Sequence, residues 1–310
     1  MKKFFLKLFY LSIPFVFLGV LSIVFLVCFT PQYKYSYTAA VLDKIKLLEE
    51  TPSPKIILCG NSNLAFGIES EMIEKKFNIP VVNLGFNGAL GNAFHEEMVK
   101  YNLQKGDVVI ICHTTYADDD RIGNSVMAWA VLENNFHLYK LIRKKDYIAM
   151  IFAFPQYIWR CSKLFFTKTG NEKPDGCYSR LAFNEKGDMI YPRFYRETVL
   201  NKEKVIVPEI NDICINRLNK FYDYCMERGA TCLIAGYPIF QREGEPIDTQ
   251  VLMKFQKTLQ EKVKIPVVSN YIDYIYDEHL FYDTFLHLTT EGAKIRTQQL
   301  CNDLERYFSK

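Results

Sequence analysis

Ser62, Asp283 and His287 are the residues of this chain whose types and spacing best suit covalent catalysis. Ser62 stands in Gly-Asn-Ser-Asn directly after a short apolar run, and Gly60 permits a tight turn there. Asp283 lies four residues before His287, so both can reach one side of a turn. A serine whose proton passes to an imidazole, itself oriented by a carboxylate, can attack an acyl group. Each residue also has an ordinary alternative role, since Ser62 could cap a helix and His287 could be a polar residue that leads into one.

The elements that must position these residues are five short apolar runs separated by helical patterns. Such runs are typical of a parallel sheet that is covered on both faces. They occupy residues 55–59, 81–84, 107–112, 231–235 and 266–269. We therefore expect an α/β domain at residues 55–310 that is three-layered and doubly wound. Its five-stranded parallel sheet should carry the site at the carboxyl ends of the strands.

Residues 116–204 interrupt this alternation and are expected to form an insertion that caps or borders the site. The most apolar part, residues 147–166, contains Pro155, Gln156 and Arg160. A second membrane span is therefore less favoured than a helix that packs on the domain or lies at the membrane surface.

Residues 8–29 form an uncharged apolar segment that, as a helix, would span about 33 Å and could cross a bilayer. Three lysines precede the segment and several tyrosines follow it. This pattern predicts a transmembrane signal-anchor, with residues 1–7 in the cytoplasm, residues 30–54 as a stalk and the large domain outside. A cleaved signal peptide is the less favoured alternative, because the apolar segment is long and no small-x-small site follows it.

The composition, with 49% apolar and 24% charged residues, is that of a folded globular protein. A net charge of +3 is too small to indicate a nucleic-acid surface. The cysteines lack metal-ligand spacing and no phosphate-binding glycine motif follows the first apolar run, so we expect neither a metal nor a cofactor. Most of the nine cysteines should be buried thiols, and only Cys161 and Cys177 are plausible disulfide partners.

The ordered blocks that contain these residues resemble the SGNH, or GDSL-like, hydrolase superfamily over residues 55–115 and 205–305. This resemblance implies a flavodoxin-like SGNH fold with Ser62 as nucleophile and as an oxyanion donor through its backbone N–H. A second block implies Gly88 as the next oxyanion donor. The last block implies the histidine as general base and the aspartate as its orienting carboxylate.

Two features depart from the pattern of that family. Its third block usually supplies an asparagine to the oxyanion hole, but here the third run is followed by His-Thr-Thr-Tyr. Asn87, or the hydroxyl of Thr115 or Tyr116, would have to donate instead. The aspartate and histidine are four residues apart, where three is common. That spacing resembles a membrane-anchored branch, which acts beside membrane-bound O-acyltransferases in cell-surface acetylation and teichoic-acid D-alanylation.

The sequence therefore predicts a membrane-anchored serine esterase or O-acyltransferase that acts on acyl groups of cell-envelope polysaccharide. Its substrate would be a cell-surface glycan or acyl ester, with a membrane-bound O-acyltransferase as a partner and no nucleic acid. The alternative is a catalytically weak or inactive accessory subunit that keeps the fold and binds a glycan or such an acyltransferase. The asparagine missing from the third block favours this alternative.

Overall fold

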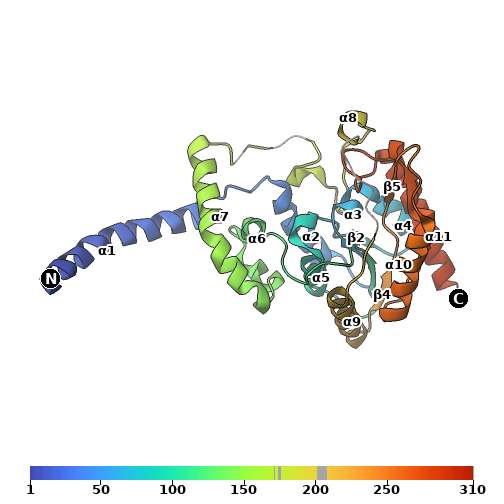
Figure 1. The fold of residues 1–310 in the computed structure, drawn as a ribbon, viewed down its shortest axis with the longest axis horizontal. Coiled ribbons are helices and arrows are strands. Elements are labelled where there is room, and N and C mark those ends of the chain that lie inside the picture. The colour runs from blue at the N-terminus through green and yellow to red at the C-terminus, as the bar shows by residue number, and fades with distance from the viewer. Residues whose placement is uncertain (171, 174–175, 201–207, 310) are drawn as a thin grey trace.

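A long N-terminal helix leads into an α/β domain in the computed structural model, which describes residues 1–170, 172–173, 176–200 and 208–309 (Figure 1). The helices are α1 Lys2–Val24, α2 Ala40–Glu50, α3 Ser62–Gly67, α4 Ser70–Phe77, α5 Asn92–Lys100, α6 Ser125–Leu132, α7 Tyr147–Thr167, α8 Glu197–Leu200, α9 Asp212–Glu227, α10 Thr249–Lys262 and α11 Thr290–Phe308. The strands are β1 Ile56–Gly60, β2 Val81–Asn83, β3 Val108–Cys112, β4 Thr231–Ile234, β5 Ile239–Gln241 and β6 Ile275–Asp277.

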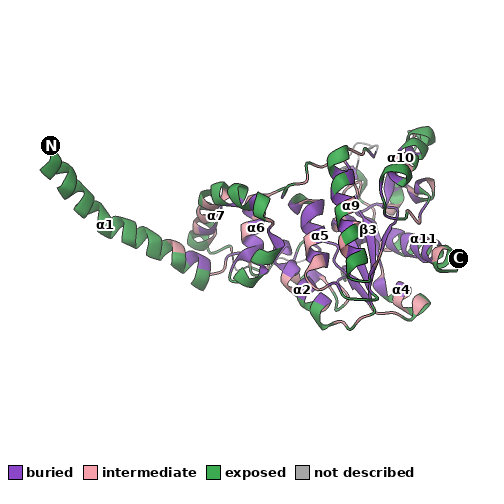
Figure 2. Ribbon diagram, turned by 90° about the horizontal axis from the view of Figure 1, so that it is seen from below, coloured by how far each residue is buried: buried purple, intermediate pink, exposed green. Residues whose placement is uncertain are grey.

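The main sheet is parallel and has the strand order β2-β1-β3-β4, while β5 and β6 form a separate parallel pair. Side chains of β1 alternate between its two faces, because successive residues of a strand point in opposite directions. Ile57 and Cys59 join one apolar cluster, to which α2, α5 and α9 contribute. Ile56 and Leu58 join a second cluster with α4 and α11. Buried strands lie between two layers of helices (Figure 2), so the predicted α/β architecture with a parallel sheet is confirmed.

The expected fifth strand at residues 266–269 is wrong. Only Val267 bridges Ile234 at the end of β4. Two backbone hydrogen bonds of 2.9 Å, from Ile234 N to Pro266 O and from Val268 N to Ile234 O, complete this contact. Pro266 has no N–H to donate to a ladder, so the run follows the sheet edge without forming a strand. Within the described residues, the main sheet therefore has four strands.

Helix α1 continues as a π-helical turn at Phe25–Phe29, and the combined helix is long and apolar enough to cross a bilayer. Nearly all of its side chains are exposed, and so large an apolar surface is unfavourable in water. Such a helix is compatible with a signal anchor or with a signal sequence.

The segment expected as a stalk, residues 30–54, differs from that expectation because its helix α2 is part of the domain. Val41, Ile45 and Leu48 line one side of α2 and are buried in the main apolar cluster. Lys44, on the same helix, is also buried, and its ammonium donates to Asn83 O at 2.9 Å and Gly187 O at 2.7 Å. Burial of this charge lowers the pKa of Lys44 to about 7.

The insertion divides into two parts, and its end at residues 201–204 lies outside the described residues. Helices α6 and α7 lie beside the end of α1, whereas residues 176–193 run back along the α/β layers (Figure 1). Cys161 and Cys177, the expected disulfide partners, are free thiols. Cys161 lies in a cluster with α1 residues and Cys177 lies in the domain core, so the two do not share a site.

Leu48→Ala should destabilise the domain by about 2–5 kcal/mol, because it leaves a cavity in the core. Chemical denaturation of the detergent-solubilised chain, followed by circular dichroism, measures this change. Lys46→Ala, at an exposed position of the same helix, is the matched control and should change stability little. Equal stabilities of the two variants would mean that α2 is a free stalk after all.

Candidate active site

One chain of hydrogen bonds brings together Ser62, His287 and Asp283. Ser62 is the first residue of α3, directly after β1, and the other two lie in the loop that precedes α11. Ser62 Oγ lies 2.8 Å from His287 Nε2, and His287 Nδ1 lies 2.7 Å from Asp283 Oδ1. With its Nδ1 proton directed at the carboxylate, the imidazole can accept the serine proton on Nε2. The three residues singled out in the sequence thus have the geometry of a Ser-His-Asp triad.

Close packing fixes the turn that presents the serine. A side chain at Gly60 would place its Cβ 2.8 Å from Cys112 O on the neighbouring strand, so only glycine fits there. Asn61 caps α3 by accepting the backbone N–H of Asn63, whose own side chain donates to Cys112 O. Arg296 of α11 is buried and donates to both the backbone and the side-chain oxygen of Asn63. The turn is therefore held by β3 on one side and by α11 on the other.

The imidazole of His287 is held by two aromatic neighbours. The Phe66 ring stacks on it, with 4.0 Å between centroids and 8° between planes. The Tyr178 hydroxyl, from the insertion, donates to Asp283 Oδ2 at 2.6 Å and lies 3.3 Å from His287 Nδ1. These contacts restrict the ring to the orientation in which both of its nitrogens are used.

The charge state of Asp283 suits the role of an orienting carboxylate. Burial alone raises its pKa, but the hydrogen bonds from His287 and Tyr178 and the positive charge of Arg196 outweigh burial and hold the pKa below its usual value. The carboxylate is therefore ionised at neutral pH and can stabilise an imidazolium when His287 takes up a proton.

A tight turn accommodates the four-residue spacing of the aspartate and histidine. His287 N–H donates to Thr284 O at 3.3 Å, and the Thr284 hydroxyl accepts the Leu286 N–H at 3.2 Å. Tyr282 N–H donates to His287 O at 2.8 Å and closes the base of the turn. The turn accommodates the additional residue, so the side chains of Asp283 and His287 remain within hydrogen-bond distance.

The residues expected to form an oxyanion hole have different environments. Gly88 lies against Asn61, since a Cβ on it would be 3.4 Å from Asn61 Nδ2. The Asn87 amide accepts the Ala89 N–H and contacts the Met127 sulfur. Tyr116 is fully buried with its hydroxyl 3.3 Å from that of Tyr271, so it cannot donate at the site. The Thr115 hydroxyl is exposed and accepts the Ala117 N–H.

A side-chain amide nevertheless stands beside Gly88, on the residue that precedes the serine. Asn61 Nδ2 donates to Thr114 Oγ1 at 2.6 Å, which links the turn after β1 to the loop after β3. A primary amide carries two N–H donors, and this contact uses one of them. The strand order reverses between β1 and β3, and the crevice at such a reversal is where ligands bind in doubly wound sheets.

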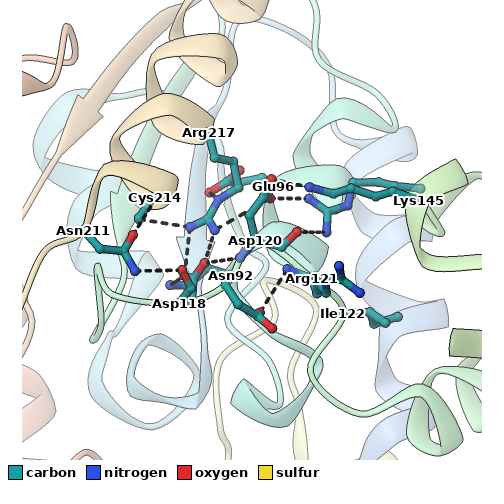
Figure 3. Close-up of polar contacts among 12 residues, drawn as sticks. Asn92, Glu96, Asp118, Asp120, Arg121, Ile122, Lys145, Asn211, Cys214 and Arg217 are labelled. Carbon is teal, nitrogen blue, oxygen red and sulfur yellow. Dashed lines mark hydrogen bonds and ion pairs between the residues drawn. The ribbon is translucent and has the colours of Figure 1, made fainter.

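The loop after β3 is held in place by the buried Arg217 of α9 (Figure 3). Its guanidinium donates to Glu96 at 2.9 Å and forms two bonds to Asp118. Asn92 adds hydrogen bonds to Asp118 Oδ2 at 2.7 Å and to Thr115 O at 2.8 Å.

Burial raises the pKa of Glu96, but the Arg217 charge and the contact with His113 outweigh it and leave the carboxyl ionised. This ion network fixes the backbone on which Thr114 stands.

Sequence reasoning missed several of the residues that shape the site. Tyr178 lies in the insertion, where no motif distinguishes it from the many other tyrosines. Phe66 stands four residues after the serine, which is one helical turn and therefore a signal available in the sequence. Among the described residues, no group of three His, Cys, Asp or Glu side chains could hold a metal ion.

Arg217→Met should destabilise the protein by about 3–5 kcal/mol, because it leaves the Glu96 carboxylate buried without the guanidinium that pairs with it. Chemical denaturation measures the loss, and Lys220→Met, which removes an exposed charge from the same helix, is the control. Adding Glu96→Gln to Arg217→Met should recover part of the stability. If Arg217→Met were as stable as the control, the network would not support this loop.

Comparisons of the chain with family models, with curated proteins and with solved structures found no match.

Proposed function

We propose that this protein is a membrane-anchored serine esterase or O-acyltransferase of the SGNH type that acts on acyl groups of cell-envelope polysaccharide. The hydrogen-bond chain from Ser62 through His287 to Asp283 is the observation that carries the proposal. The β2-β1-β3-β4 strand order supports the flavodoxin-like SGNH fold, as does the order of the residue blocks along the chain.

The location proposed for the enzyme rests on α1. Lys2, Lys3 and Lys7 precede its uncharged stretch, which favours a cytoplasmic N-terminus. The length of that stretch, with no small-x-small site after it, favours an uncleaved anchor. The α/β domain would then stand on the outer side of the membrane, where acylated envelope polysaccharides occur. A membrane-bound O-acyltransferase is the natural partner for an anchored enzyme with this chemistry.

The proposed reaction begins when Ser62 Oγ attacks the acyl carbonyl and His287 Nε2 takes up the serine proton. Asp283 stabilises the imidazolium that forms. The C–O bond to the leaving group breaks, His287 protonates that oxygen, and the acyl group remains on the serine. A water molecule or a sugar hydroxyl then attacks the acyl carbon and gives its proton to His287. The ester bond to Ser62 Oγ breaks, the acyl product leaves, and His287 returns the proton to that oxygen. Water gives hydrolysis and a sugar hydroxyl gives transfer.

The negative charge that develops on the carbonyl oxygen needs donors close to the serine. We assign this role to the backbone N–H groups of Ser62 and Gly88 and to the second Nδ2 proton of Asn61. In this arrangement Asn61 supplies the amide that the SGNH pattern usually takes from the loop after the third strand. Thr114 keeps the Asn61 amide in place by accepting its other proton.

Ser62→Ala and His287→Gln should each abolish labelling by a fluorophosphonate probe and lower ester hydrolysis at least about a thousandfold. The chain offers a matched control in His279, whose Nδ1 lies 2.6 Å from Asp277 Oδ1 but which is exposed on the surface. His279→Gln should keep full labelling. Unchanged turnover in folded Ser62→Ala protein would instead favour the non-catalytic accessory role.

Asn61→Asp should lower kcat for p-nitrophenyl acetate by about 10²–10³ with little change in KM, because it removes an oxyanion donor. The aspartate keeps the oxygen that caps α3, and the Thr114 hydroxyl can donate to it. Thr114→Val keeps the Asn61 amide and should cost much less activity. Equal losses in the two variants would mean that Asn61 acts only through its bond to Thr114.

A further inference from the structure

Helix α7 carries an apolar stripe that the proposed reaction does not use. Ile148, Phe152, Trp159 and Phe166 recur at helical spacing on one side, and their exposed fractions are 68%, 81%, 73% and 80%. The opposite side, which includes Tyr157, is buried against the rest of the insertion. Soluble surfaces rarely leave a contiguous row of large apolar side chains in water, so this stripe marks an interaction surface.

The position of α7 relates the stripe to the N-terminal helix. The Phe165 ring meets the Phe25 ring edge-on, with 6.1 Å between centroids, and Val27 shares a buried cluster with Tyr157 and Cys161. In Figure 1, α7 runs across the end of α1 on the side of the domain from which α1 extends, and in Figure 2 it is seen nearly end-on. If α1 crosses a bilayer, α7 therefore lies along the surface of that bilayer.

The remaining residues of α7 match the chemistry of a lipid interface. The helix contains no aspartate or glutamate, and Arg160 and Lys163 are exposed beside the stripe. Basic side chains next to Trp and Phe are typical of helices that lie at the level of the lipid headgroups, where the cations reach the phosphates. Lys168, directly after the helix, adds a further exposed cation.

We propose that α7 is an interfacial helix whose stripe inserts into the outer leaflet of the membrane that α1 spans. The inference rests on the anchored topology proposed above and adds a second attachment to it. Lipid fits better than a protein partner because the stripe continues the apolar surface of α1. One anchor alone would let the domain swing, whereas two attachments fix which side of it faces the membrane.

Fluorescence of the two tryptophans of the chain tests this proposal. The full-length protein is reconstituted alone into vesicles of phosphatidylcholine and phosphatidylglycerol, with and without bromine on the lipid acyl chains. Bromine quenches an indole that lies among those chains, so the wild type should lose a large part of its emission. Trp159→Phe removes the exposed indole and should abolish most of that loss. The remaining Trp129 is half-buried, packs on Phe154 and donates to Met150 O at 2.7 Å.

Trp129→Phe, which leaves Trp159 as the only tryptophan, should show the strongest quenching by brominated lipid and protection from aqueous iodide. Flotation of the same vesicles reports separately on α1. If the chain floats with the vesicles but iodide still quenches Trp159, the proposed interfacial helix is wrong and the anchor stands. The stripe would then be a surface for a protein partner. A chain that does not float overturns the topology and this inference together. Labelling of Ser62 is independent of both outcomes.

Discussion

The buried guanidinium of Arg296 is the contact on which the arrangement of the site depends. It donates to both oxygens of Asn63 and approaches α3 so closely that a Cβ at Gly67 would lie 2.7 Å from its Nη1. Removing a guanidinium from water is costly unless its N–H groups find acceptors, so this turn has to present its oxygens to α11. Thr289 caps the same helix, and His287 stands just before that cap. Helix α11 thereby fixes both the turn that carries Ser62 and the loop that carries His287.

The sequence was sufficient for the four strands of the main sheet but not for its edge or for what surrounds it. Residues 56–59 and 108–112 are apolar throughout, because both faces of a parallel strand are covered, and this property is local. Residues 266–269 contain two valines but begin with Pro266, which prevents the run from pairing as a strand. Helix α2 showed apolar residues at helical spacing, which is the signal of a packed face. The charged Lys44 on the same side of the helix argued against burial. Its burial could not be predicted, because the carbonyls that accept its protons belong to Asn83 and Gly187, far away in the sequence.

The triad could be predicted because each of its residues stands in a short motif at a strand or helix end. Its supports could not, since they are defined only by tertiary contacts. Tyr178 reaches Asp283 across 105 residues of chain, and no spacing in the sequence encodes that contact. Tyr116 looked suitable because it follows the third strand, but its ring lies on the core side and its hydroxyl meets Tyr271. Asn61 was visible in the first motif, yet the oxyanion role proposed for it depends on where Gly88 and Thr114 lie in the fold.

The contact of the insertion with the start of the domain has a practical consequence for protein engineering. Tyr37 touches the Tyr178 ring, Ser36 pairs with Ser179, and Arg180 forms a bidentate ion pair with Asp43. A secreted, anchor-free version of the protein must therefore begin before Ser36. A later starting residue would remove the surface on which Tyr178 packs and, with it, the hydroxyl that steadies Asp283. The boundary that suits crystallisation is set by this aromatic contact rather than by the first strand.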